Sequence, residues 1–345
     1  TRRISRFLYK IRGICYTEIS KIKISFSGKA GIQLENLLIS ANAVLPLMLC
    51  MAAGYLARRM KFGGDAFYIQ CNSFCFKVFM PLMMFNNIYH ADLKTAFQPD
   101  LILFTVISVL AVSAAAFFIV RLLVKDGSRR AVLTQGIFRS NYVIFGLPVA
   151  INVYGEGHAA TAALLSAVAV PLFNVLAVFT LEYYSGKKTG SLSVVKGVLT
   201  NPLILGALAA LLFQALSIPL PRAVNAAVAD LGDAATPLAL VILGATFRFG
   251  EVRKNLRWLS IGVWGKLLAV PLVMIPIAIL LGFRDVALLS LTILFASPTA
   301  VSSFTMAEAA GHDGELAAQQ VVFSSIFSLL TVFLWIYALK SMGLI

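Results

Sequence analysis

The chain has 345 residues, of which 59% are hydrophobic and only 13% are charged, and its formal net charge is +14. Soluble domains contain about 45–50% apolar and about 25% charged residues, so the composition excludes an ordinary soluble protein. The basic residues fall in short clusters between apolar runs. This pattern is typical of the loops of a polytopic membrane protein and argues against nucleic acid as a partner.

Residues 1–36 are strongly basic and contain no uninterrupted apolar segment of membrane-spanning length. We expect this N-terminal extension to lie outside the fold, as a targeting-like arm or as an amphipathic segment on the membrane surface. The four cysteines form no metal-binding or disulfide pattern, and the sequence predicts neither a metal nor a cofactor.

Ten segments are long and apolar enough to be candidate membrane spans, which need about 20 predominantly apolar residues each. They lie at approximately 37–57, 68–89, 100–124, 131–153, 158–181, 197–217, 223–246, 257–281, 285–308 and 315–339. The sequence therefore predicts an all-α polytopic membrane protein embedded in a lipid bilayer.

Lys and Arg residues cluster in the loops after the odd-numbered spans, as at Arg58, Arg59 and Lys61. The loops after the even-numbered spans contain few basic residues: Lys94, Arg222 and Arg284. Because cytoplasmic loops are enriched in Lys and Arg, this asymmetry predicts that the odd-to-even loops are cytoplasmic.

Paired prolines indicate an internal repeat. Pro202 follows Pro46 by 156 residues, and Pro237 follows Pro81 by the same interval. Each repeat would contain five spans, which is an odd number. The second repeat would therefore enter the membrane from the opposite side, as inverted repeats of transporters do. We expect a first five-helix repeat at 37–181, a short cytoplasmic loop at 182–196, and a second, inverted repeat at 197–345.

The fourth span contains polar and helix-breaking residues at 139–148, among them Arg139, Asn141, Gly146 and Pro148. At membrane depth an interrupted helix is tolerated only inside protein or beside a water-filled cavity. We place the break of this helix at residues 146–148. An alternative is an ordinary proline kink in a long helix.

The ninth span contains a matching interruption at Ser297, Pro298 and Thr299, followed by Ser302 and further hydroxyl residues. Two broken helices at corresponding positions of inverted repeats would cross near the bilayer midplane, where transporters bind substrate. The predicted substrate-binding residues are Asn141, Gly146, Pro148, Ser297, Pro298, Thr299 and Ser302.

Ionisable residues within the predicted spans favour an anionic substrate, because Lys77, Arg139 and Lys266 outnumber the acidic residues Asp230 and Asp233 near one end of the seventh span. The N-termini of half-helices also attract anions. Lys77 and Asp233 are separated by the repeat interval of 156 residues, so they are either a structural pair or a proton relay. Arg139 either contacts the substrate or snorkels to the cytoplasmic surface.

Other polar residues in the spans have competing interpretations. Asn141 could be a substrate ligand or an interhelical contact, and for Asn174, Gln319 and Gln320 we expect packing or capping. A membrane-embedded aspartyl protease using Asp233 would need a second carboxylate in a facing span, and no other span has an Asp in its interior, so the sequence does not predict an enzyme.

Several motifs together resemble the auxin efflux carrier family, from about residue 37 to the end of the chain. They are Arg139-x-Asn141 leading into Gly146-Leu147-Pro148, the break at Ser297-Pro298-Thr299, Asn201-Pro202 at the start of the sixth span, and the turn Gly311-His312-Asp313. The short central loop is similar to that of bacterial members, some of which are associated with malate or malonate uptake.

The resemblance implies an elevator-type carrier in a bacterial inner membrane, with a fold like that of bile-acid/sodium symporters. Spans one, two, six and seven would form a scaffold and a homodimer contact, and the remaining spans would carry the substrate. Proton or sodium coupling is possible in such a carrier. The expected substrate is a mono- or dicarboxylate. The alternatives are a sodium-coupled bile-acid-like symporter, an exporter of another amphipathic anion and, remotely, a membrane enzyme.

Overall fold

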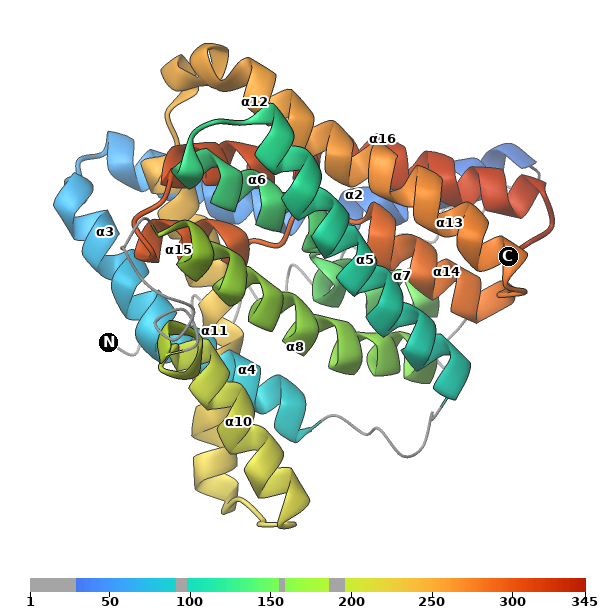
Figure 1. The fold of residues 1–345 in the computed structure, drawn as a ribbon, viewed down its shortest axis with the longest axis horizontal. Helices are drawn as coiled ribbons and strands as arrows, with labels where there is room; N and C mark the ends of the chain where they lie inside the picture. The colour runs from blue at the N-terminus through green and yellow to red at the C-terminus, as the bar shows by residue number, and fades with distance from the viewer. Residues whose placement is uncertain (1–28, 91–97, 155–158, 186–195) are drawn as a thin grey trace.

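The computed structural model describes residues 29–90, 98–154, 159–185 and 196–345, and every regular element in them is helical (Figure 1). In chain order the elements are α2 (Lys29–Arg59), α3 (Asp65–Phe74), η2 (Cys75–Phe79), α4 (Met80–Tyr89), α5 (Pro99–Leu123), α6 (Gly127–Phe138), α7 (Tyr142–Tyr154), α8 (Ala159–Tyr184), α10 (Pro202–Ala215), α11 (Arg222–Thr246), η4 (Phe249–Glu251), α12 (Val252–Trp264), η5 (Gly265–Ala269), α13 (Val270–Leu280), α14 (Asp285–Ala296), α15 (Ser302–Ala309) and α16 (Gly314–Ser341).

Five helical stretches in the described part of the chain have the length and apolar character needed to cross a membrane. They are Pro99–Leu123, Ala160–Tyr184, Arg222–Thr246, Phe249–Leu280 and Gly314–Ser341. Two shorter apolar helices, α10 and α14, accompany them. The chain is therefore an all-helical polytopic membrane protein, and the number of its spans stays a prediction.

Helix α2 begins at Lys29, so residues 29–36 belong to a helix, although they fall within the predicted extension at 1–36. Residues 1–28 lie outside the described part of the chain. Further along, α2 packs closely against α11 through two glycines. A Cβ atom added at Gly54 would overlap the carbonyl oxygen of Val241, and one added at Gly244 would overlap that of Met51. Small residues allow this approach of helix backbones in membranes.

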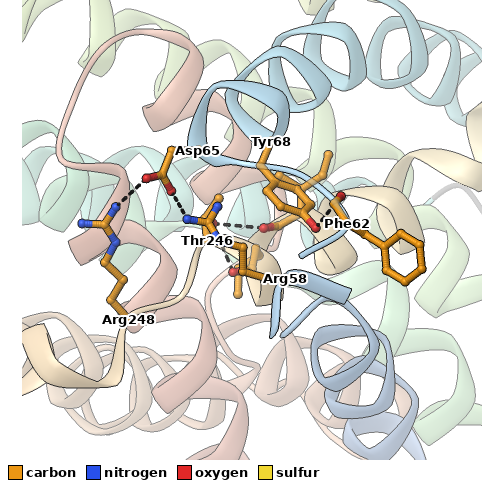
Figure 2. Close-up of polar contacts among 8 residues, drawn as sticks. Arg58, Phe62, Asp65, Tyr68, Thr246 and Arg248 are labelled. Atoms are coloured by element: carbon orange, nitrogen blue, oxygen red, sulfur yellow. Dashed lines mark hydrogen bonds and ion pairs between the residues drawn. The ribbon is translucent and has the colours of Figure 1, made fainter. Parts of the chain in front are cut away.

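One end of this helix pair carries an exposed charge cluster (Figure 2). Asp65, at the start of α3, accepts a hydrogen bond of 2.6 Å from Arg58 near the end of α2 and one of 3.3 Å from Arg248 after α11. The guanidinium of Arg58 also lies 5.7 Å from the ring centre of Tyr68. The hydrogen bond from Arg58 is the main reason that the pKa of Asp65 lies below its usual value. The cluster connects the end of α2 and the start of α3 with the segment after α11, which is 183 residues further along the chain.

Two of the predicted spans are broken into half-helices. The fourth divides into α6 and α7, and the ninth divides into α14 and α15. The second break begins at Ser297, where the sequence predicted it. Ser297 has an extended backbone (φ −63°, ψ 153°) because Pro298 follows it, and proline disfavours the helical conformation of the residue before it.

The first break lies at residues 139–141, so our placement of it at residues 146–148 was wrong. Gly146 and Pro148 are within α7, whose backbone is helical from Tyr142 to Tyr154. An internal proline removes one hydrogen bond and kinks a helix in a membrane, but neighbouring groups can make up for this loss. The helix instead ends where Arg139 becomes extended (φ −74°, ψ 136°).

Candidate functional site

The two breaks meet through their backbones. The backbone N–H of Asn141 donates a hydrogen bond of 2.8 Å to the carbonyl oxygen of Pro298. The hydroxyl of Thr299 donates to the carbonyl oxygen of Gly136 (2.8 Å), and the backbone N–H of Thr299 donates to the hydroxyl of Ser324 on α16 (3.1 Å). Backbone groups freed by the breaks thus find partners within the protein, as a membrane interior requires.

Each break also creates a helix N-terminus beside the crossing. Helix α7 begins at Tyr142 and α15 begins at Ser302, and both residues line one cavity together with the residues that precede them. The first N–H groups of a helix have no partner within the helix and carry partial positive charge, which favours an anion. Two such ends therefore border the same space.

The cavity has a volume of about 80 Å³ and lies between the two breaks, α4, α8 and α11. The part of its lining that the structure describes is mostly apolar and neutral polar, with one cationic side chain. The residues are Met80, Met83, Asn87, Arg139, Ser140, Asn141, Tyr142, Val143, Ile144, Val170, Phe173, Asn174, Thr236, Ala239, Ala300, Val301 and Ser302. Three of the predicted site residues, Arg139, Asn141 and Ser302, are among them.

Arg139 is the cationic residue of the lining, and its side chain is only 2% exposed. Its Nη2 atom donates to the Oδ1 atom of Asn174 (2.8 Å) and to the hydroxyl of Ser302 (2.6 Å), while Nη1 lies 2.8 Å from the sulfur of Met306. All three partners are neutral, and Nε has no hydrogen-bond partner among the described residues. No carboxylate of the described residues pairs with this guanidinium. Arg139 therefore faces the cavity and does not snorkel to the surface.

Asn174 holds Arg139 in this orientation. Its Oδ1 accepts from the guanidinium, and its own Nδ2 donates to the carbonyl oxygen of Val170 (2.9 Å), so the amide is fixed with its oxygen toward Arg139. The sequence marked Asn174 as a polar residue in an apolar span and favoured packing or capping. The structure gives it a positioning role next to the predicted site.

Free hydrogen-bond donors complete the polar side of the cavity. The Nδ2 atom of Asn141 and the hydroxyl of Ser140 are buried and have no hydrogen-bond partner in the described part of the chain, and the two residues are 8% and 4% exposed. Buried polar groups are nearly always hydrogen-bonded in native structures. A ligand that accepts hydrogen bonds would satisfy these donors and the Nε of Arg139 together.

The remaining predicted residues are not among the described residues of the cavity lining. Ser297, Pro298 and Thr299 form the second break but are not part of the cavity lining. Gly146 and Pro148 lie in α7, and their side chains are outside the described residues. Lys77 and Asp233 are both exposed and do not line the cavity, and their pairing or relay role stays a prediction.

Two polar contacts beside the crossing had no signal in the sequence. The side-chain amide of Gln135 on α6 donates to the carbonyl oxygen of Ser303 (3.1 Å). The side-chain amide of Asn72 on α3 donates to the carbonyl oxygen of Thr305 (3.1 Å). Both amides bind backbone carbonyls of α15 that are far away in the sequence, so only the folded structure could show these contacts. Among the described residues, no group of three His, Cys, Asp or Glu side chains could hold a metal ion.

An arrangement of two broken helices around a cavity is typical of membrane transporters. Comparison with known proteins leads to the same class. The chain matches the family described as membrane transport protein over residues 39–191 and 189–336. It therefore belongs to this family, the auxin efflux carriers, which is a family of transporters and not a known enzyme family. The chain is also 26% identical to an "Uncharacterized transporter" of Methanothermobacter thermautotrophicus over 300 residues, which cover 86% of this chain and 97% of that protein.

Proposed function

We propose that this protein is a secondary carrier that moves a small organic anion, a mono- or dicarboxylate, across the membrane. The observation that carries the proposal is Arg139, a guanidinium buried in a cavity without a carboxylate partner among the described residues. A buried cation that has only neutral partners costs free energy, and an anionic ligand would offset this cost. A cationic substrate would instead be repelled.

The substrate would be bound by three kinds of donors at the crossing. Arg139 would pair with the carboxylate, Asn141 and Ser140 would donate hydrogen bonds, and the N-termini of α7 and α15 would contribute the partial positive charge of the helix ends. Charge-assisted hydrogen bonds from Arg to a carboxylate are short and strong, and the N-terminus of a helix is suited to anions. The other side of the cavity would hold the apolar part of the substrate.

We further propose ten spans in two inverted five-helix repeats, at 37–181 and 197–345. The lengths of the half-helices support this arrangement: α6 and α14 have 12 residues each, which corresponds to about 18 Å of helix. That is a little more than half of a hydrocarbon core of about 30 Å, so breaks at their ends would lie near the midplane. We also propose elevator-type alternating access, with the crossing as the moving site, because the family resemblance implies a carrier of this type.

The remaining features of the proposal come from the resemblance and the charge pattern. The carrier would reside in a bacterial inner membrane with its odd-to-even loops in the cytoplasm, and it would form a homodimer through the scaffold spans. The alternatives are sodium coupling like that of bile-acid symporters and export of another amphipathic anion.

The test is uptake of a panel of radiolabelled mono- and dicarboxylates into proteoliposomes, with and without sodium and proton gradients. We expect Arg139→Gln to lower uptake by about 10- to 150-fold, because it removes a charge-assisted bond of roughly 1.5–3 kcal/mol and the one charged side chain in the described lining. The matched control is Arg121→Gln, which removes an exposed arginine at the end of α5 that donates to Tyr183 and does not line the cavity. Normal uptake by a correctly folded Arg139→Gln protein would refute the proposal.

A further inference from the structure

We propose that the cavity selects anions with one carboxylate and a short apolar body, and discriminates against diacids. This inference rests on the proposed function, because it names the class of acid that the same site would bind. It also assigns the selectivity to the wall that α4 and α11 contribute, which includes Met80, Met83, Thr236 and Ala239.

The first argument is the number of charges. Of the described residues that line the cavity, Arg139 alone is charged. One carboxylate can pair with this guanidinium and with the free donors of Ser140 and Asn141. A second carboxylate in the same cavity would be desolvated without a cationic partner, and a buried unpaired charge is strongly disfavoured.

The second argument is the chemistry of the α4–α11 wall. Met80, Met83 and Ala239 have no strong hydrogen-bond donor, and the hydroxyl of Thr236 is directed to the sulfur of Met83 at 3.7 Å. From α8, Val170 and Phe173 add further apolar surface. Asn87 is the one amide that α4 contributes to the lining, and it is exposed, where water competes for its hydrogen bonds. This wall therefore suits a hydrocarbon group.

The third argument is size. A water molecule needs about 10–15 Å³ of such volume, so a cavity of about 80 Å³ has room for roughly five to eight water-sized groups. An acid with about three to six carbon atoms would fill that space. A sterol-sized anion would not fit in this conformation.

The test compares acids of nearly equal shape that differ in charge. Binding of succinate and monomethyl succinate, and of methylmalonate and isobutyrate, is measured by calorimetry on the purified protein in nanodiscs at about pH 7.5, where all free carboxylates are ionised. We expect the monoanion of at least one pair to bind at least about 10-fold more tightly than its dianion partner.

The outcomes separate the two proposals. Tighter binding of succinate and methylmalonate would overturn the selectivity inference while leaving an anion site in place. Failure of all four acids to bind to folded protein would refute the acid-binding site itself, and the selectivity inference with it. The comparison uses the unmodified chain, so it does not depend on any variant folding.

A variant then tests the assignment to the α4–α11 wall. Met83→Lys adds a second cation to the lining, and we expect it to shift the succinate-to-monomethyl succinate affinity ratio toward succinate by at least about 10-fold. Met60→Lys, at an exposed position just after α2, is the matched control and should leave the ratio unchanged. An unchanged ratio in a folded Met83→Lys protein would overturn the role of this wall.

Discussion

Asn174→Asp should weaken anion binding and at the same time stabilise the folded protein. The substitution conserves shape and places a carboxylate where Oδ1 now accepts a hydrogen bond of 2.8 Å from Arg139. It also removes the hydrogen bond from Nδ2 to the carbonyl oxygen of Val170, a neutral bond that we expect the new ion pair to outweigh. The guanidinium would then have a permanent internal counter-ion. The carboxylate of a substrate bound to the same guanidinium would lie about 5 Å from the new carboxylate, within the range of strong repulsion.

The magnitude follows from Coulomb's law. Two like charges about 5 Å apart at an effective dielectric constant of about 20 repel each other by about 3 kcal/mol, which corresponds to a loss of affinity of about 200-fold. Asn174→Ala removes the acceptor without adding a charge. It should cost only about 1–2 kcal/mol, or about 10-fold in affinity, because Arg139 becomes less well oriented.

The assay measures carboxylate affinity by calorimetry and the midpoint of thermal unfolding, both in nanodiscs. We expect a higher unfolding midpoint for the ligand-free Asn174→Asp protein than for the wild type, since a buried unpaired charge has gained its partner. Asn87→Asp, at an exposed part of the same cavity, is the control, because water and salt screen its charge there. An affinity of Asn174→Asp within threefold of the wild type would refute the reasoning that Arg139 is the uncompensated charge of the site.

Two further predictions concern stability away from the cavity. A Cβ atom at Gly136 would overlap the amide of Gln320, so Gly136→Ala should lower the unfolding midpoint by an amount equivalent to about 1–3 kcal/mol. The double variant with Gln320→Ala should recover most of this loss, and equal losses in the single and double variants would show that the overlap is not the cause. The second prediction concerns Asp65, whose pKa is lowered in the folded protein, chiefly by its hydrogen bond from Arg58. Ionised Asp65 therefore stabilises the folded protein at pH values above the unfolded pKa of about 4. This stabilisation is lost as the pH falls through the lower pKa of the folded protein. Wild type should therefore unfold at a higher temperature than Asp65→Asn at pH 7, and the two should converge toward pH 3; a gap that stays constant with pH would contradict this assignment.

The sequence was informative where local rules decide the structure. Composition and apolar segments showed an all-helical membrane protein, and the motifs indicated the family that the comparison confirms. The break at Ser297 agrees with the proline after it, which disfavours a helical backbone at the preceding residue. Arg139 and Asn141 were also unusual in the sequence, because they are polar residues within an apolar span.

The first break shows where local rules were insufficient. Gly146 and Pro148 are the stronger helix breakers in isolation, yet α7 continues through them. The chain opens instead at residues 139–141, because the backbone of Asn141 gains Pro298 as a partner from the other broken helix. Propensity alone could not predict this, because the stabilising group lies far away in the sequence.

The sequence by itself determined the class of the protein, the positions of its apolar segments and the presence of a cation within one of them. Only the tertiary structure decided what that cation does. Arg139 faces a cavity because its partners, Asn174, Ser302 and Met306, come from positions 35, 163 and 167 residues away. In a membrane interior a charged group must find its hydrogen-bond partners within the protein, so its orientation depends on how distant helices pack.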